Sequence, residues 1–140
     1  MRKILVPVDA SKSAEHAVRY AAKLVADTPS LQLHLLNIQE PLDTRAHAYM
    51  SQQEIKTIQT ADSQRVLQAA MAILDDAGVP YRTEWRVGDV ASTIAAYAQE
   101  IECEGIVMGT RGLGAVTNLM MGSVAYKVVH LVQVPVTLVK

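Results

Sequence analysis

The chain has 140 residues, of which 50% are hydrophobic and 19% charged, so it is not intrinsically disordered, and we expect residues 1–140 to form a single domain with a full core. The net charge of −1 argues against nucleic-acid binding, and because Cys103 is the only cysteine, an intrachain disulfide and a cysteine-rich metal site are excluded. We expect that the N-terminal segment is not a signal peptide, because it has no long apolar region and no cleavage signal, and no run approaches the roughly 18 apolar residues of a membrane span. We therefore expect a cytoplasmic protein without membrane contact.

The first predicted strand is an apolar, β-branched run at residues 3–8, typical of a strand buried on both faces of a parallel sheet. Asp9 follows it, and a helix begins near Ser11 or Ser13, either of which is a suitable N-cap. A second strand is predicted at residues 31–38. This part of the chain therefore predicts a β-α-β unit.

The middle of the chain is predicted to hold one long helix. Residues 39–50 are interpreted as a polar loop, and Ser51-Gln-Gln-Glu54 matches a capping box that opens the helix. Gly78 followed by Pro80 ends it. The residues predicted to face inward are Ile55, Ile58, Val66, Ala70, Ile73 and Leu74.

The last third of the chain continues the alternation of strands and helices. Residues 81–87 alternate between apolar and polar side chains, which indicates a strand near the sheet edge with one wetter face. A helix follows, then a strand at 105–108, a helix at 124–132 and a strand at 134–139. The order β-α-β-α-β-α-β-α-β predicts an α/β fold, an open five-stranded parallel sheet with helices on both faces.

Unusual residues follow two of these strands. Pro7-Val8-Asp9 ends the first strand, and Gly109-Thr-Arg-Gly112 ends the fourth. Open α/β sheets bind ligands beyond the carboxyl ends of the strands, where the winding direction reverses. If the two strands are neighbours, the strand order is 3-2-1-4-5 and an acid faces a glycine turn. A divalent cation between Asp9 and a phosphate would explain that pairing.

Nine residues after Gly112, the pair Gly122-Ser123 opens the last helix. Unpaired N–H groups and the positive end of the helix dipole favour a phosphate there. The segment lacks the Gly-Lys-Ser/Thr ending of a P-loop and the third glycine of a dinucleotide fingerprint. Three simpler roles stay open: Asp9 as an N-cap, Arg111 as a solvated charge, and Ser123 as an N-cap only.

The stretch 108–125 resembles the G-2x-G-9x-G-(S/T) signature of the universal stress protein family, complete from Gly109 to Ser123. The opening and the ending of the chain, at 3–9 and 134–139, also fit that family. The resemblance therefore covers the whole chain, and it implies a Rossmann-like fold of the adenine nucleotide alpha hydrolase type. In this family, members with the full motif bind ATP and members without it generally do not.

The resemblance implies an ATP site in which Asp9 holds Mg²⁺ or Mn²⁺. Ile38 would meet adenine through its backbone, and Met108 and Gly109 would pass beside the ribose and the phosphates. Ala10 stands where many members have glycine, a change that leaves the phosphate loop intact. The implied nucleotide-binding residues are Pro7, Val8, Asp9, Ile38, Met108, Gly109, Arg111, Gly112, Gly122, Ser123, Val124 and Ala125.

No nucleophile and base pair stands out, so we expect an ATP-binding stress-response regulator or sensor with at most slow ATP hydrolysis. One alternative is a genuine ATP phosphohydrolase or nucleotidyl-transfer enzyme on the same fold. Another is a purely structural dimer. The family commonly forms homodimers by antiparallel pairing of the last strand, here residues 134–139, and an apolar edge strand needs such a cover.

Overall fold

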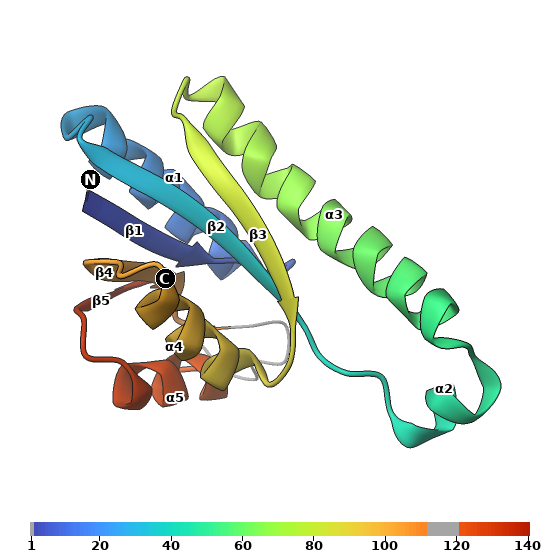
Figure 1. Cartoon of the computed structure of the whole chain (residues 1–140). Helices are drawn as coiled ribbons and strands as arrows, with labels where there is room; N and C mark the ends of the chain where they lie inside the picture. The colour runs from blue at the N-terminus through green and yellow to red at the C-terminus, as the bar shows by residue number, and fades with distance from the viewer. Residues whose placement is uncertain (1, 112–120) are drawn as a thin grey trace.

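The structure is a computed structural model that describes residues 2–111 and 121–140. Strands and helices alternate along these residues as predicted, except for one additional short helix (Figure 1). The elements are β1 (Arg2–Pro7), α1 (Lys12–Asp27), β2 (Leu31–Gln39), α2 (Thr44–Tyr49), α3 (Gln52–Asp76), β3 (Tyr81–Val87), α4 (Val90–Glu100), β4 (Gly105–Gly109), α5 (Ser123–Leu131) and β5 (Val136–Val139).

The five strands form one parallel sheet in the order β3-β2-β1-β4-β5, which confirms the predicted order. Successive strands are added on one side from β1 to β3, and then on the other side from β4 to β5. The winding direction therefore reverses between β1 and β4. The carboxyl ends of these two strands lie where a doubly wound sheet binds its ligand.

Two hydrophobic cores lie on opposite faces of the sheet. Helices α1 and α3 cover one face and α4 and α5 the other (Figure 1). Side chains of the central strand alternate between them, because Ile4 and Val6 belong to the first core and Leu5 to the second. This explains the continuous apolar run of β1, since a strand covered on both faces has no position for a solvated side chain.

The start of α3 is as predicted, but its buried face is different. Glu54 donates its N–H to Ser51 Oγ and its carboxylate accepts from the Ser51 N–H, which confirms the capping box. The prediction that Ile58 faces inward is wrong, because its side chain is 40% exposed. Several buried positions lie one residue after the predicted ones, as Gln59 does after Ile58. Because the buried face includes polar side chains, the pattern of apolar residues did not reveal it. Its members are Ile55, Gln59, Ser63, Leu67, Ala70 and Leu74.

Ser63 is completely buried on this face, and its hydroxyl has no hydrogen-bond partner among the described residues. We expect Ser63→Ala to raise the free energy of unfolding by about 1 kcal/mol, because an unsatisfied buried hydroxyl is removed. Urea denaturation measures the change. Ser13→Ala is the matched control, since Ser13 is also buried in a helix but donates to the Val139 carbonyl at 3.1 Å. That variant should be destabilised, and the same sign for both would contradict the prediction.

The interpretation of residues 39–50 as a loop is wrong in part. Strand β2 extends to Gln39, and α2 forms a short helix whose N-cap, Asp43, accepts from the Ala46 N–H at 2.9 Å. No residue of α2 is buried. A helix without an apolar stripe has no periodic signal in the sequence, so only its cap could have indicated it.

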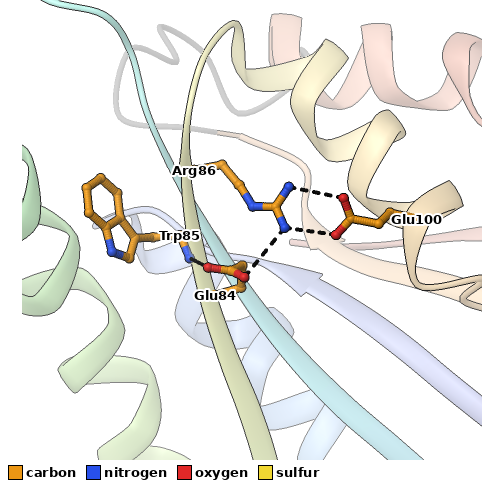
Figure 2. Close-up of polar contacts among 4 residues, drawn as sticks. All are labelled: Glu84, Trp85, Arg86 and Glu100. Atoms are coloured by element: carbon orange, nitrogen blue, oxygen red, sulfur yellow. Dashed lines mark hydrogen bonds and ion pairs between the residues drawn. The ribbon is translucent and has the colours of Figure 1, made fainter.

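Strand β3 lies at the edge of the sheet, as predicted, and its two faces carry different side chains, but the face of Arg82, Glu84 and Arg86 is not the more exposed one. Trp85 packs against the core under α1 and α3, whereas Arg86 lies on the opposite face (Figure 2). The Arg86 guanidinium contacts both carboxylate oxygens of Glu100 at 2.8 and 3.2 Å and lies 5.0 Å from the ring centre of Tyr97. These contacts join α4 to β3 and help to position the helix that borders the ligand cavity described below.

Candidate functional site

A cavity of about 410 Å³ lies at the carboxyl ends of β1 and β4, where the winding direction reverses. Its size is that of a pocket for a small molecule. Its wall contains every predicted site residue that the structure describes. Gly112 lies outside the described residues. The predicted residues in the wall are Pro7, Val8, Asp9, Ile38, Met108, Gly109, Arg111, Gly122, Ser123, Val124 and Ala125.

Part of the wall was missed in the sequence. Leu36 and Glu40 lie two residues either side of Ile38, so strand alternation could have placed them on the same face. Val90 and Ile94 come from α4, whose position over the sheet depends on tertiary packing. The other missed residues are Ser11, Ala14 and Thr110.

Asp9 begins the connection from β1 to α1. Its Oδ1 accepts a hydrogen bond from the Ser11 N–H at 2.9 Å. Ser11 is the N-cap of α1, because its Oγ accepts from the Ala14 N–H at 3.1 Å. Asp9 is therefore not the helix cap. It is an exposed carboxylate in the cavity wall, oriented by the backbone of the following turn.

The floor beside Asp9 is held by Asn37, a buried side chain of β2. Its Nδ2 donates to the Val8 carbonyl at 2.9 Å, and its Oδ1 accepts from Gln39 Nε2 at 2.7 Å. The Val8 N–H donates to the Leu36 carbonyl at 2.8 Å. Val8 is thus held through both backbone groups. Nothing in the strand pattern indicated Asn37, since the buried positions of β2 are otherwise mostly apolar.

We expect Asn37→Leu to lower the free energy of unfolding by about 1–3 kcal/mol, because the buried carbonyl of Val8 loses its donor. Ligand affinity should fall as well, since Val8 is part of the cavity wall. Urea denaturation measures the first effect. The control Gln39→Ala keeps the hydrogen bond from Asn37 to Val8, so this variant should lose less of the free energy of unfolding. Wild-type stability of Asn37→Leu would rule out this role.

The backbone of Ile38 is directed toward the side of β2 that faces β1. The Leu36 carbonyl accepts from Val8 on that side, and the Gln39 carbonyl accepts from Gly88 on the other. Because backbone groups alternate in direction along a strand, those of Ile38 point the same way as those of Leu36. The ladder with β1 ends at Leu36, so no strand pairs with Ile38 there in the described chain. One donor and one acceptor are left at the cavity.

Two glycines of the motif have different structural roles. Gly109 ends β4 directly against α1, and a Cβ at this position would lie 2.7 Å from the carbonyl carbon of Ser13. Gly122 donates its N–H to the Thr110 carbonyl at 2.6 Å, which joins the end of the motif to its beginning. The expectation of unpaired N–H groups at this helix start is therefore wrong for Gly122 itself.

The next three N–H groups of α5 are unpaired in the described part of the chain, as expected for this helix start. The N-cap is Gly122, which has no side chain to cap the helix, and Ser123 is the first helical residue rather than the cap. The N–H groups of Ser123, Val124 and Ala125 have no hydrogen-bond partner within the described residues. All three residues line the cavity. The positive end of the α5 dipole therefore lies at its wall.

Charged groups are separated along the cavity. Asp9 and Glu40 follow β1 and β2, whereas Arg111 follows β4 and precedes the start of α5. Because the strand order is β2-β1-β4, the carboxylates lie toward one end and the positive groups toward the other. The β4 and α5 end therefore favours an anion. The β2 end favours a cation or a hydrogen-bond donor.

The residues fit a metal ion that arrives with a ligand. In the part of the chain that the structure describes, no group of three or more His, Cys, Asp or Glu side chains could hold a metal. Asp9 supplies one carboxylate, and Mg²⁺ in such a site takes its remaining oxygens from phosphates and water. The donor chemistry therefore suits a divalent cation bound together with a phosphate.

The family model for universal stress proteins matches residues 1–140. The chain belongs to the universal stress protein family. Universal stress protein Sll1654 of Synechocystis sp. is 34% identical over 142 residues, an alignment that covers 99% of this chain and 85% of that protein. The family that the glycine motif predicted is thus confirmed.

Solved structures of other universal stress proteins share the fold. UspA from Lactobacillus plantarum superposes with a TM-score of 0.82 at 22% identity, covering 99% of this chain and 97% of that one. An Arabidopsis thaliana family member with AMP bound has a TM-score of 0.73 at 21% identity, covering 100% and 92%. Relatives of this fold have also been solved with cAMP, at a TM-score of 0.74, and with dAMP, at 0.71.

Two features outside the cavity bear on other predictions. Among the described helices of this family member, none is long and apolar enough to cross a membrane.

Cys103 is buried, and burial raises the pKa of its thiol, so little reactive thiolate forms near neutral pH. The cysteine therefore has a packing role.

Proposed function

We propose that this protein binds ATP together with Mg²⁺ or Mn²⁺ and acts as a nucleotide-dependent regulator or sensor of the stress response. The observation that carries the proposal is the polarity of the cavity. One end offers the N–H groups of α5 and Arg111, and the other offers the backbone of Ile38. Relatives with bound AMP, cAMP and dAMP support an adenine nucleotide as the ligand.

In this proposal, adenine lies between β2 and α4. The Ile38 N–H donates to N1 of the ring and the Ile38 carbonyl accepts from its exocyclic amine, while Leu36, Val90 and Ile94 contact its faces. The phosphates lie at the start of α5, where N–H groups and the helix dipole stabilise negative charge. Asp9 lies between these regions, and its carboxylate would hold the metal ion.

The same wall favours binding over rapid hydrolysis. Among the described lining residues there is no His, Lys or Cys to act as a base beside the Ser and Thr hydroxyls, and the Glu40 carboxylate lies at the β2 end, away from the start of α5. The Asp9 carboxylate is held by the Ser11 N–H and is assigned to the metal. We therefore infer at most slow ATP hydrolysis. Multiple-turnover kinetics test this, and turnover near 1 per second or faster, within the usual enzymic range, would favour a phosphohydrolase or nucleotidyl-transfer enzyme.

Binding itself is tested on the purified protein. We expect acid release and chromatography, or titration calorimetry with ATP and Mg²⁺, to detect an adenine nucleotide. ATP at 100 times its dissociation constant should stabilise the fold by about 2.7 kcal/mol, which thermal unfolding measures. Recovery of no nucleotide, together with no heat of binding and no thermal shift, would refute the proposal.

We further propose a cytoplasmic homodimer that pairs residues 134–139 of two copies in antiparallel fashion. Strand β5 is an edge of the sheet, and its sequence, Val-Thr-Leu-Val, carries no charge. Such an edge favours pairing with another strand. Sedimentation equilibrium should give the mass of a dimer, and a monomer at micromolar concentration would contradict this assembly.

A further inference from the structure

Glu40 is the carboxylate of the cavity that the ATP site described above does not use. It directly follows β2 and lies on the same face as Leu36 and Ile38, and all three line the cavity. The side chain is exposed at the mouth and has no hydrogen bond or ion pair within the described chain. No local structural role therefore explains an acid at this position.

The position of Glu40 determines which part of a nucleotide it can meet. It lies at the β2 end, on the far side of Asp9 from Arg111 and the start of α5. A carboxylate accepts hydrogen bonds and repels phosphate, so phosphates at the α5 end leave the nucleoside at the Glu40 end. The nucleoside donors are the adenine amine and the ribose hydroxyls.

The backbone of Ile38 decides between these donors. Its carbonyl faces the cavity without a strand partner and can accept from the adenine amine deep in the wall. Glu40 is two residues further toward solvent, at the mouth, where the sugar would lie. Two carboxylate oxygens suit two vicinal hydroxyls, and doubly wound dinucleotide-binding folds use a single Asp or Glu for this contact.

We propose that Glu40 accepts hydrogen bonds from the ribose hydroxyls and makes this site selective for ribonucleotides over 2′-deoxyribonucleotides. The inference rests on the proposed ATP site. A site that accepts hydrogen bonds from the ligand's hydroxyls discriminates against a ligand that lacks one of them, because the carboxylate then loses a charge-assisted hydrogen bond. The wild-type protein should therefore bind ATP about tenfold more tightly than 2′-deoxy-ATP.

The experiment compares dissociation constants for ATP, 2′-deoxy-ATP, 3′-deoxy-ATP and ITP by calorimetry in the wild type, Glu40→Ala and Glu40→Gln. Glu40→Ala should weaken ATP more than about tenfold and should weaken 2′-deoxy-ATP and 3′-deoxy-ATP less, because each of these keeps one hydroxyl, so that the preference for ATP is abolished. Glu40→Gln, which keeps one acceptor, should be intermediate. Glu102→Gln is the matched control, since it removes an exposed carboxylate before β4, at the amino end of the sheet.

The outcomes separate this inference from the proposed function. If the wild type binds ATP and the Glu40 variants keep the ribose preference, only the role of Glu40 is overturned. A change in the ratio of ATP to ITP instead would place Glu40 at the adenine amine and also overturn it. Failure of the wild type to bind any of the four nucleotides would overturn both proposals.

Discussion

Replacing Gly122 with valine is expected to weaken ATP binding at least about 100-fold while the protein remains folded. The backbone of Gly122, with φ −63° and ψ 155°, is in a region that valine readily adopts, so the substitution introduces no backbone strain. The new side chain would stand in the cavity wall at the start of α5. It would separate a phosphate from the N–H groups there, and charge-assisted hydrogen bonds worth about 3 kcal/mol would be lost.

Calorimetric titration with ATP and Mg²⁺ measures this loss, and far-UV circular dichroism checks the fold. Gly122→Ala is the matched variant, since one methyl group occupies less of the cavity, and its affinity should lie between the other two. Equal affinity of the valine variant and the wild type would refute the assignment of this helix start to the phosphates.

Replacing Gly109 with alanine is expected to destabilise the fold by about 1–3 kcal/mol and to weaken nucleotide binding as well. The added Cβ would lie 2.7 Å from the carbonyl carbon and 2.8 Å from the Cβ of Ser13, so α1 must move away from β4. Backbone cannot adjust as a flexible side chain can, and overpacking of this kind has such a cost. The first turn of α1 carries Ser11 and Ala14 into the cavity wall, so its displacement also changes the site.

The matched control lies on the same strand. A Cβ at Gly105 would be 3.5 Å from the Pro135 carbonyl oxygen, an ordinary contact, so Gly105→Ala should unfold at nearly the wild-type urea concentration. If both variants were equally stable, the close approach of α1 to β4 would not be a determinant of the fold.

Most of the cavity wall could be predicted from the sequence, in part from local patterns and in part from the family resemblance. The glycine motif placed Gly109, Arg111 and Gly122 in the wall, and the end of the first strand placed Asp9 there. Glu40 shares the face of Ile38 by simple alternation and was missed, because a single acid after a strand is common and indicates nothing without a cavity. Arg111 lines the cavity, as predicted. Its role as a phosphate contact stays a prediction.

The hydrogen bonds within the site could not be predicted in the same way. The Gly122 N–H is used by the Thr110 carbonyl, and Asn37 supports Val8 from the neighbouring strand. Such bonds depend on which strands are adjacent and in what register. A helix without a buried face, like α2, is invisible to periodicity for a related reason, since nothing but its cap distinguishes it from a loop.

The sequence by itself determined the α/β class, the order of all elements except α2, and the family, because alternating hydrophobic periods and a complete glycine motif are properties of short segments. It also located the capping box of Ser51 and Glu54. Only the tertiary structure decided how the ends of β1, β2, β4, α4 and α5 meet, and therefore which groups share one cavity. The physical reason is that parallel strands bring their carboxyl ends to one edge of the sheet. The separation of acidic from positive groups along the cavity, and the backbone groups that are left unpaired there, therefore depend on several segments together.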